Sequence, residues 1–244
     1  MKKFNTHIPD KIKLAYDTNM LKRNKKYYTY WEYHKHPNLL ILGNTGSGKS
    51  YFLRTLVARI ALHIPTAQAY ICDFKNEFME KSHDNSKFYG YTDVLTGFNE
   101  FYAIMEERLK GCKNREFRLL LIDEVVSWYN SMDKKDSENV RKRMANLLFM
   151  CRSLNLHCVL GAQRGMAENF SHGSRDSLNV IFLGSPSKES IGSFVSQEDS
   201  SKIKPRGIGE GYTIFDGEKP RAITVPKINS MDRLNELLTE IATR

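Results

Sequence analysis

The sequence predicts an α/β fold in which a mostly parallel central sheet is covered by helices on both faces. Short, wholly apolar runs, which are typical of buried parallel strands, alternate with longer runs whose apolar residues recur at helical spacing. That alternation builds a parallel sheet with helices packed against both sides. Polar residues follow most of the apolar runs, and ligands of such folds bind at the carboxyl ends of the strands.

In the first half of the chain, the apolar run at residues 38–42 predicts the first strand. A helix over 50–63 follows, because its apolar residues recur at helical spacing and Pro65 ends it. A β-rich run at 68–73 predicts the second strand. Residues 74–92 look irregular, and 98–110 has the spacing of another helix.

In the second half, residues 118–123 form an apolar strand with an acidic end. The remaining pattern predicts further elements in chain order: a helix over 137–154, strands at 157–162 and 179–183, a short helix over 188–195 and an amphipathic helix over 231–243. Asp216-Gly217 separates runs at 211–215 and 221–225, which indicates a β-hairpin.

Composition indicates a folded protein with one sizeable core, because 244 residues with 41% hydrophobic side chains can bury it. No run reaches the roughly eighteen apolar residues of a membrane span, and no signal peptide is visible. The cysteines form no C-x-x-C pair and are interpreted as reduced thiols. We therefore expect a cytoplasmic protein without a membrane span.

The net charge of +9 is concentrated at the N-terminus, where residues 1–36 carry nine Lys and Arg against three acidic residues. Five aromatic residues lie among these charges: Tyr27, Tyr28, Tyr30, Trp31 and Tyr33. Such a segment suits a phosphate backbone and stacked bases. It is equally consistent with an extension whose aromatics pack on the domain while its basic side chains are solvated.

Residues 43–50 match the phosphate-binding P-loop, in which two glycines five apart precede Lys and Ser. The glycines let successive backbone N–H groups turn inward around a polyphosphate. Lys49 is expected to reach the β- and γ-phosphates of ATP, and the Ser50 hydroxyl to hold Mg²⁺. The predicted nucleotide-binding residues are Gly43, Asn44, Thr45, Gly46, Ser47, Gly48, Lys49, Ser50 and Tyr51. A glycine-rich turn without a ligand is the alternative.

The strand at 118–123 ends in two carboxylates. Asp123 is expected to be the second magnesium-side residue besides Ser50, and Glu124 to orient and deprotonate the attacking water. Gln163 ends the strand at 157–162. If that strand lies between the P-loop strand and the acidic strand, the Gln163 amide reaches the γ-phosphate.

These residues resemble the FtsK/HerA group of P-loop motor ATPases, which includes DNA translocases and the coupling ATPases of conjugation. The P-loop and the acidic strand are shared with many ATPases. More specific is the segment 71–77, which is similar to the group's D-x-K-x-E segment. The strand end at 161–164 and the segment 206–212 also look like features of the group. The resemblance covers roughly residues 38–225.

The resemblance implies a RecA/ASCE-like P-loop NTPase, a homo-oligomeric and hexameric ring, and DNA passing through its centre. It also implies an arginine donated by the next subunit. Members of the group often use an arginine just before or within the strand matching 179–183, where this chain has Leu178-Asn179. Arg175 is the first candidate, followed by Arg164 and Arg206. The expected catalytic residues are Glu124, Lys49, Gln163 and Arg175.

The predicted division is a basic aromatic N-terminal extension, 1–36, and a P-loop motor ATPase domain, 37–244. The leading hypothesis is a DNA-dependent ATPase that moves single- or double-stranded DNA for plasmid or mobile-element transfer or maintenance, with protein partners in a transfer or replication complex. Two alternatives stay open: a secretion or phage-assembly ATPase resembling zonular-occludens-type proteins, and a nucleotide-gated DNA-binding switch. Lys75 and Glu77 either face the nucleotide cleft or form an interface pair.

Overall fold

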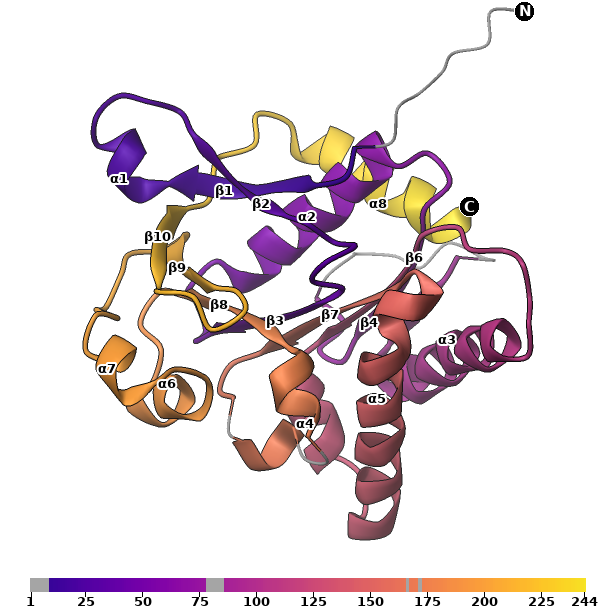
Figure 1. The fold of residues 1–244 in the computed structure, drawn as a ribbon. Coiled ribbons are helices and arrows are strands. Elements are labelled where there is room, and N and C mark those ends of the chain that lie inside the picture. The colour runs from indigo at the N-terminus through magenta and orange to yellow at the C-terminus, as the bar shows by residue number, and fades with distance from the viewer. Residues whose placement is uncertain (1–8, 78–85, 166, 171–172) are drawn as a thin grey trace, which may run out of the picture.

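The computed structural model describes residues 9–77, 86–165, 167–170 and 173–244. Residues 1–8 of the predicted extension and 78–85 of the predicted irregular stretch lie outside this description. A ten-stranded sheet forms the centre of the molecule, with strand order β2-β1-β10-β9-β8-β3-β7-β6-β4-β5 (Figure 1).

One part of the sheet consists of six parallel strands. They are β3 (Asn38–Gly43), β4 (Gln68–Asp73), β5 (Phe88–Gly90), β6 (Arg118–Asp123), β7 (Leu156–Ala162) and β8 (Asn179–Leu183). Every pairing among them is parallel. The sequence predicted all of these strands except β5, and the mostly parallel sheet is confirmed.

The other part of the sheet is antiparallel. The predicted hairpin is present as β9 (Glu210–Ile214) and β10 (Arg221–Thr224), and β9 pairs with β8. Beyond β10, the strands β1 (Ile12–Asp17) and β2 (Tyr28–Trp31), joined through helix α1 (Thr18–Leu21), extend the sheet to its edge. The sequence analysis did not predict these two strands, and the predicted boundary at residues 36 and 37 falls between β2 and β3.

Helices cover both faces of the sheet (Figure 1). On one face lie α2 (Lys49–His63) and α8 (Met231–Thr243), and on the other lie α3 (Val94–Leu109), α4 (Val125–Asn130), α5 (Lys134–Leu154) and α6 (Lys188–Phe194). Helix α7 (Gln197–Ser200) follows α6. Leu39 and Ile41 of β3 pack in the first core, and Leu40 and Leu42 in the second. Successive side chains of a strand point to opposite faces, so a wholly apolar strand serves both cores.

The register of the parallel strands brings their carboxyl ends to one edge of the sheet. β7 lies between β3 and β6, which is the condition under which Gln163 was expected to approach the phosphates. Asp73 at the end of β4 is paired with Asp123 at the end of β6. Among the helices of the described residues, none combines the length and apolar character that crossing a bilayer requires.

Candidate nucleotide-binding site

The P-loop connects the end of β3 to the start of α2. Gly46 and Gly48 have φ angles of 80° and 91°, a region that residues with a side chain rarely adopt, which explains glycine at both positions. Gly48 is the N-cap of α2, and no side chain caps that helix. The N–H groups of its first turn are therefore available to an anion, and the helix dipole favours one there.

A cleft of about 250 Å³ lies against this loop. It contains most of the predicted nucleotide-binding and catalytic side chains, together with two residues from the segment after β4. Its lining consists of Asn44, Thr45, Gly46, Gly48, Lys49, Ser50, Tyr51, Lys75, Glu77, Glu124 and Gln163. The sequence left open whether Lys75 and Glu77 face this cleft, and the structure places both in its wall.

Lys49 is buried at the base of the cleft and is neutralised by two carboxylates. Its ammonium group forms an ion pair with Asp123 and lies 3.0 Å from Oε1 of Glu124. An unpaired charge at this depth would be costly, so the two acids balance the cation while no phosphate is bound. A triphosphate in the cleft offers the same ammonium group a competing anion.

Glu124 leaves the end of β6 in a left-handed backbone conformation, with φ 60° and ψ 42°. A non-glycine residue held there stores strain of about 1 kcal/mol, which the surrounding packing sustains. Burial alone raises the pKa of the Glu124 carboxyl, but the charges and hydrogen bonds of Lys49 and Lys75 outweigh it. The net pKa is lowered, so the carboxylate is ionised at neutral pH and able to accept a proton.

The Glu124 carboxylate has two further neighbours in the cleft. Lys75 Nζ lies 3.2 Å from its Oε1, and Gln163 donates a hydrogen bond of 3.3 Å to the same oxygen. The Lys75 backbone N–H donates to Asp73, which ties this segment to the end of β4. The sequence analysis left Lys75 either in the nucleotide cleft or in an interface pair and did not identify Glu124 as its partner, although its place in the D-x-K-x-E segment was a signal.

The residues expected to hold Mg²⁺ fit that ion by donor type and position. The Ser50 hydroxyl is 3.3 Å from Oδ2 of Asp123, so two oxygen donors converge beside the phosphate loop. Mg²⁺ prefers oxygen ligands and is held in nucleotide sites by one or two such groups. The close approach also depends on Gly161, where an added Cβ would lie 2.4 Å from Oδ1 of Asp123.

The three candidate arginines lie in different environments. Arg164 is exposed directly after Gln163. Arg206 is held in place, because its Nε donates to the Tyr212 hydroxyl and its guanidinium lies 4.9 Å from the Tyr212 ring centre. Arg175 precedes β8, so it lies at the amino-terminal end of this strand, whereas the P-loop follows the carboxyl end of the neighbouring parallel strand β3.

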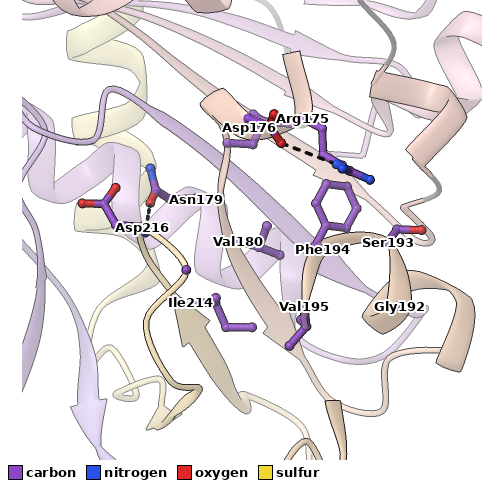
Figure 2. Close-up of a pocket in the computed structure, with 12 residues that line it drawn as sticks. Arg175, Asp176, Asn179, Val180, Gly192, Ser193, Phe194, Val195, Ile214 and Asp216 are labelled. Atoms are coloured by element: carbon purple, nitrogen blue, oxygen red, sulfur yellow. Dashed lines mark hydrogen bonds and ion pairs between the residues drawn. The ribbon is translucent and has the colours of Figure 1, made fainter. Parts of the chain in front are cut away.

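Figure 2 shows Arg175 at the wall of a second cavity of about 410 Å³. Its Nε lies 3.7 Å from Asp176, and Asn179 nearby accepts a hydrogen bond from the Asp216 backbone. Asn179 is paired with Leu39, and Leu183 with Gly43, so the length of β8 separates this cavity from the P-loop. Five residues of strand span on the order of 15 Å. Arg175 therefore lies at the other end of β8 from the nucleotide cleft of its own chain.

We compared the sequence with models of known protein families to test the resemblance. Residues 9–115, which contain the P-loop and the segment after β4, match the FtsK/SpoIIIE family. The resemblance to FtsK-type ATPases is confirmed. The FtsK domain-containing protein YdcQ of Bacillus subtilis (strain 168) is 26% identical over 201 residues, which cover 75% of this chain and 41% of that protein. The chain thus spans less than half of this FtsK-type relative.

Solved structures of FtsK-type ATPases share the fold. The conjugation coupling protein TcpA of pCW3, in a monomer form with ATPγS, superposes with a TM-score of 0.74 at 17% identity and covers 98% of this chain and 72% of its own. ATPases 2 and 3 of Thermomonospora curvata EccC, in complex with a signal sequence peptide, give a TM-score of 0.68 at 18% identity, over 92% of this chain and 42% of theirs. These similarities show that the chain shares the fold of these proteins.

Proposed function

We propose that this protein is an ATP-hydrolysing DNA translocase of the FtsK/HerA type that works as a homo-oligomeric, hexameric ring in plasmid or mobile-element transfer or maintenance. The observation that carries the proposal is the convergence of Lys49, Asp123 and Glu124 in one buried cluster beside the P-loop cleft. A P-loop protein that only binds nucleotide has little need of an ionised second carboxylate at this position.

The proposed roles follow from the positions of the side chains. Lys49 leaves its carboxylate partners for the β- and γ-phosphates when ATP enters, which frees Glu124 to accept a proton from the attacking water. Ser50 and Asp123 would hold Mg²⁺, which would neutralise charge on the phosphates. Gln163 shares the cleft with Glu124, and its amide can bond both water and phosphate.

Arg175 is proposed to act on the nucleotide of the neighbouring subunit. It lies at the amino-terminal end of β8, at the opposite end of the sheet's strands from its own P-loop. In a head-to-tail ring it is therefore available to the nucleotide site of the neighbouring subunit and not to its own. An arginine supplied in this way neutralises charge in the transition state and typically raises the rate of hydrolysis by about 10³ to 10⁵.

The DNA part of the proposal is supported by charge. The chain carries +9, most of it in the N-terminal segment, and a basic surface attracts the phosphate backbone.

The test is ATP turnover by the purified chain, measured with and without single- and double-stranded DNA. We expect DNA to stimulate turnover, and Lys49→Ala and Glu124→Gln to abolish it. If neither form of DNA changes the rate of ATP turnover and a protein partner increases it, the proposed DNA translocation is wrong. Such a result would favour a secretion or phage-assembly ATPase. Bound ATP that survives for hours with Mg²⁺ and DNA would replace it with a nucleotide-gated switch.

A further inference from the structure

The β1–β2 hairpin presents a surface of tyrosines and basic residues on its outer side. In the ladder, Lys13 is paired with Tyr30 and Tyr16 with Tyr28. The neighbouring pair Ile12 and Trp31 is fully buried. Alternate residues of β2 point to opposite faces, so Tyr30 and Tyr28 point away from the side of Trp31. The register shift between Lys13 and Ala15 keeps their partners Lys13 and Tyr16 on that same outer side. We call this the hairpin face and define it by Lys11, Lys13, Tyr16, Lys26, Tyr28 and Tyr30.

Three tyrosine rings form a row on the hairpin face. The ring centres of Tyr16 and Tyr28 are 4.6 Å apart, and those of Tyr28 and Tyr30 are 6.4 Å apart. The Tyr28 hydroxyl also donates a hydrogen bond of 3.0 Å to the Tyr16 hydroxyl. The rings are carried by two paired strands, so their spacing is set before any partner arrives.

Basic side chains lie directly on this row. Lys11 Nζ is 4.6 Å from the Tyr30 ring centre, and Lys13 Nζ is 4.8 Å from that of Tyr28. On the inner side, Arg59 of α2 donates hydrogen bonds of 2.7 Å to the carbonyls of Lys13 and Leu14, which ties β1 to the helix. The face therefore combines stacking surfaces with cations at the same positions.

The connection between the two strands adds more positive charge. Residues 9–31 contain six Lys and Arg against two acidic residues. One of the acids, Asp17, caps α1 by accepting from the N–H groups of Asn19 and Met20. The remaining cations of the connection are exposed and belong to the same end of the hairpin: Lys22, Arg23, Lys25 and Lys26.

We propose that the hairpin face binds single-stranded nucleic acid, with bases stacking on the tyrosine row and phosphates pairing with the lysines. Aromatic side chains in a basic setting bind unpaired strands in this manner, because every base has a face that can stack. A duplex keeps its base faces inside the helix, so its phosphates would contact the lysines but its bases would not stack on the tyrosine rings. Lysines held over the rings on flexible stems can turn to phosphates when a base takes their place.

This inference deepens the proposed function, because it names a contact for the DNA, and it relies on that function only for the claim that the contact serves translocation. The binding itself needs no ATP. The hairpin lies at the edge of the sheet beyond β10 (Figure 1), whereas the P-loop cleft lies at the end of β3. The two claims can therefore fail independently.

The experiment measures fluorescence anisotropy of labelled twenty-nucleotide oligothymidine, oligouridine and a DNA duplex of equal length, with the full chain and without nucleotide. We expect the single strands to bind more tightly than the duplex. Tyr28→Ala with Tyr30→Ala should weaken single-strand binding by about tenfold or more. Tyr28→Phe with Tyr30→Phe should bind like the parent, because phenyl rings still stack. The two single strands separate DNA from RNA as the ligand.

A salt titration tests the cations. Lys11→Gln with Lys13→Gln should reduce the slope of log K against log salt by about 1.4, the value for two phosphate contacts on a single strand. Tyr91→Ala and Lys142→Gln are the matched controls, because both are exposed residues away from the hairpin. Binding of a fluorescent ATP analogue by every variant shows that the fold is intact.

The proposal is overturned if the parent binds no single strand, if the duplex binds as tightly, or if the alanine variants bind like the parent. Lys49→Ala separates the two claims. Oligonucleotide binding that survives in this variant, while DNA fails to stimulate ATP turnover in the parent, would remove the translocase and leave the hairpin site in place.

Discussion

The ammonium group of Lys75 lies 3.2 Å from the carboxylate of Glu124, across the cleft beside the P-loop. Lys75 follows β4 and Glu124 follows β6, so two parallel neighbouring strands deliver the pair. The Lys75 side chain is 35% exposed, whereas that of Glu124 is 4% exposed. The lysine is therefore the partner that can move, and it sets the charge around a fixed carboxylate.

The first prediction concerns the acid limb of ATP turnover. Lys49 and Lys75 hold the pKa of Glu124 below its usual value, so Lys75→Met should raise that pKa. A base with a raised pKa becomes protonated at higher pH. The acid limb of kcat should therefore move towards neutral pH, as measured by turnover between pH 5 and pH 9. Lys142→Met, an exposed change on α5, should leave the profile in place. If the fall of kcat on the acid side of the pH profile is unchanged in Lys75→Met, Lys75 does not control the pKa of Glu124.

The second prediction separates nucleotide binding from hydrolysis. Glu124→Gln should keep ATP affinity while kcat falls by about 10² to 10⁴, the usual contribution of a general base. Lys49→Ala should lose affinity as well, because it removes the cation and leaves Asp123 and Glu124 as neighbouring carboxylates without it. Equilibrium binding of an ATP analogue and single-turnover hydrolysis measure the two effects. Full hydrolysis by Glu124→Gln would remove this residue from the proposed chemistry.

The third prediction tests the crowding at Asp123. Gly161→Ala would place a methyl group 2.4 Å from Oδ1 of Asp123 and 3.0 Å from Leu53. The carboxylate is buried and paired with Lys49, so it cannot yield without losing its position. We expect at least a tenfold rise in the Mg²⁺ concentration that supports half-maximal turnover. Gly192→Ala is the control, because nothing lies within 4 Å of its added Cβ and α6 favours alanine there. Equal Mg²⁺ dependence in both variants would contradict this reasoning.

The fourth prediction tests action between subunits. Arg175→Ala and Glu124→Gln should each be nearly inactive when assayed alone. In Arg175→Ala we expect kcat to fall by a factor of about 10³ or more. When the two are mixed, some interfaces combine an intact Glu124 with an intact Arg175, and turnover should return. Arg164→Ala in the same mixture serves as the comparison, because Arg164 is exposed after Gln163 at the sheet edge of its own P-loop. A mixture that stays inactive would exclude Arg175 as the donated arginine.

The fifth prediction concerns acid stability. His157 is 1% exposed, stacks on Phe117 at 4.0 Å, and has no partner for Nδ1 among the described residues. Burial holds its pKa well below the usual value. The unfolded chain then binds more protons below about pH 6.5, so stability falls as the pH drops through that point.

His157→Phe should therefore lose less stability than the parent between pH 7.5 and pH 5.5, by about 1 kcal/mol. Urea denaturation at the two pH values measures the difference. His63→Phe should have a smaller effect, because His63 is exposed and its pKa is lowered less far by partial burial. An unchanged pH dependence in His157→Phe would assign the acid sensitivity to other groups.

Sequence reasoning predicted the parallel strands other than β5, and the β9–β10 hairpin, because their signals are local. The apolar run of β6 and the turn residues at Asp216-Gly217 each indicate their own structure without reference to distant residues. The sequence analysis did not predict β1 and β2 because charged and aromatic residues lie among their apolar residues and obscure the strand pattern. Only their outer side is basic, and the inner side contains Trp31 at 0% exposure. Tyr33 packs beside it in the same core, which is what the packing interpretation expected of those two aromatics.

From the sequence alone came the phosphate loop, the acidic end of β6 and the alternation that makes a parallel sheet, because backbone conformation and burial pattern act over a few neighbouring residues. Only the tertiary structure decided that Lys75 faces Glu124 and that Arg175 lies at the edge away from its own P-loop. The order of strands in the sheet determines both, and that order depends on long-range packing. The same packing decided which tyrosines of the N-terminal segment are buried and which remain on the outer side of the hairpin.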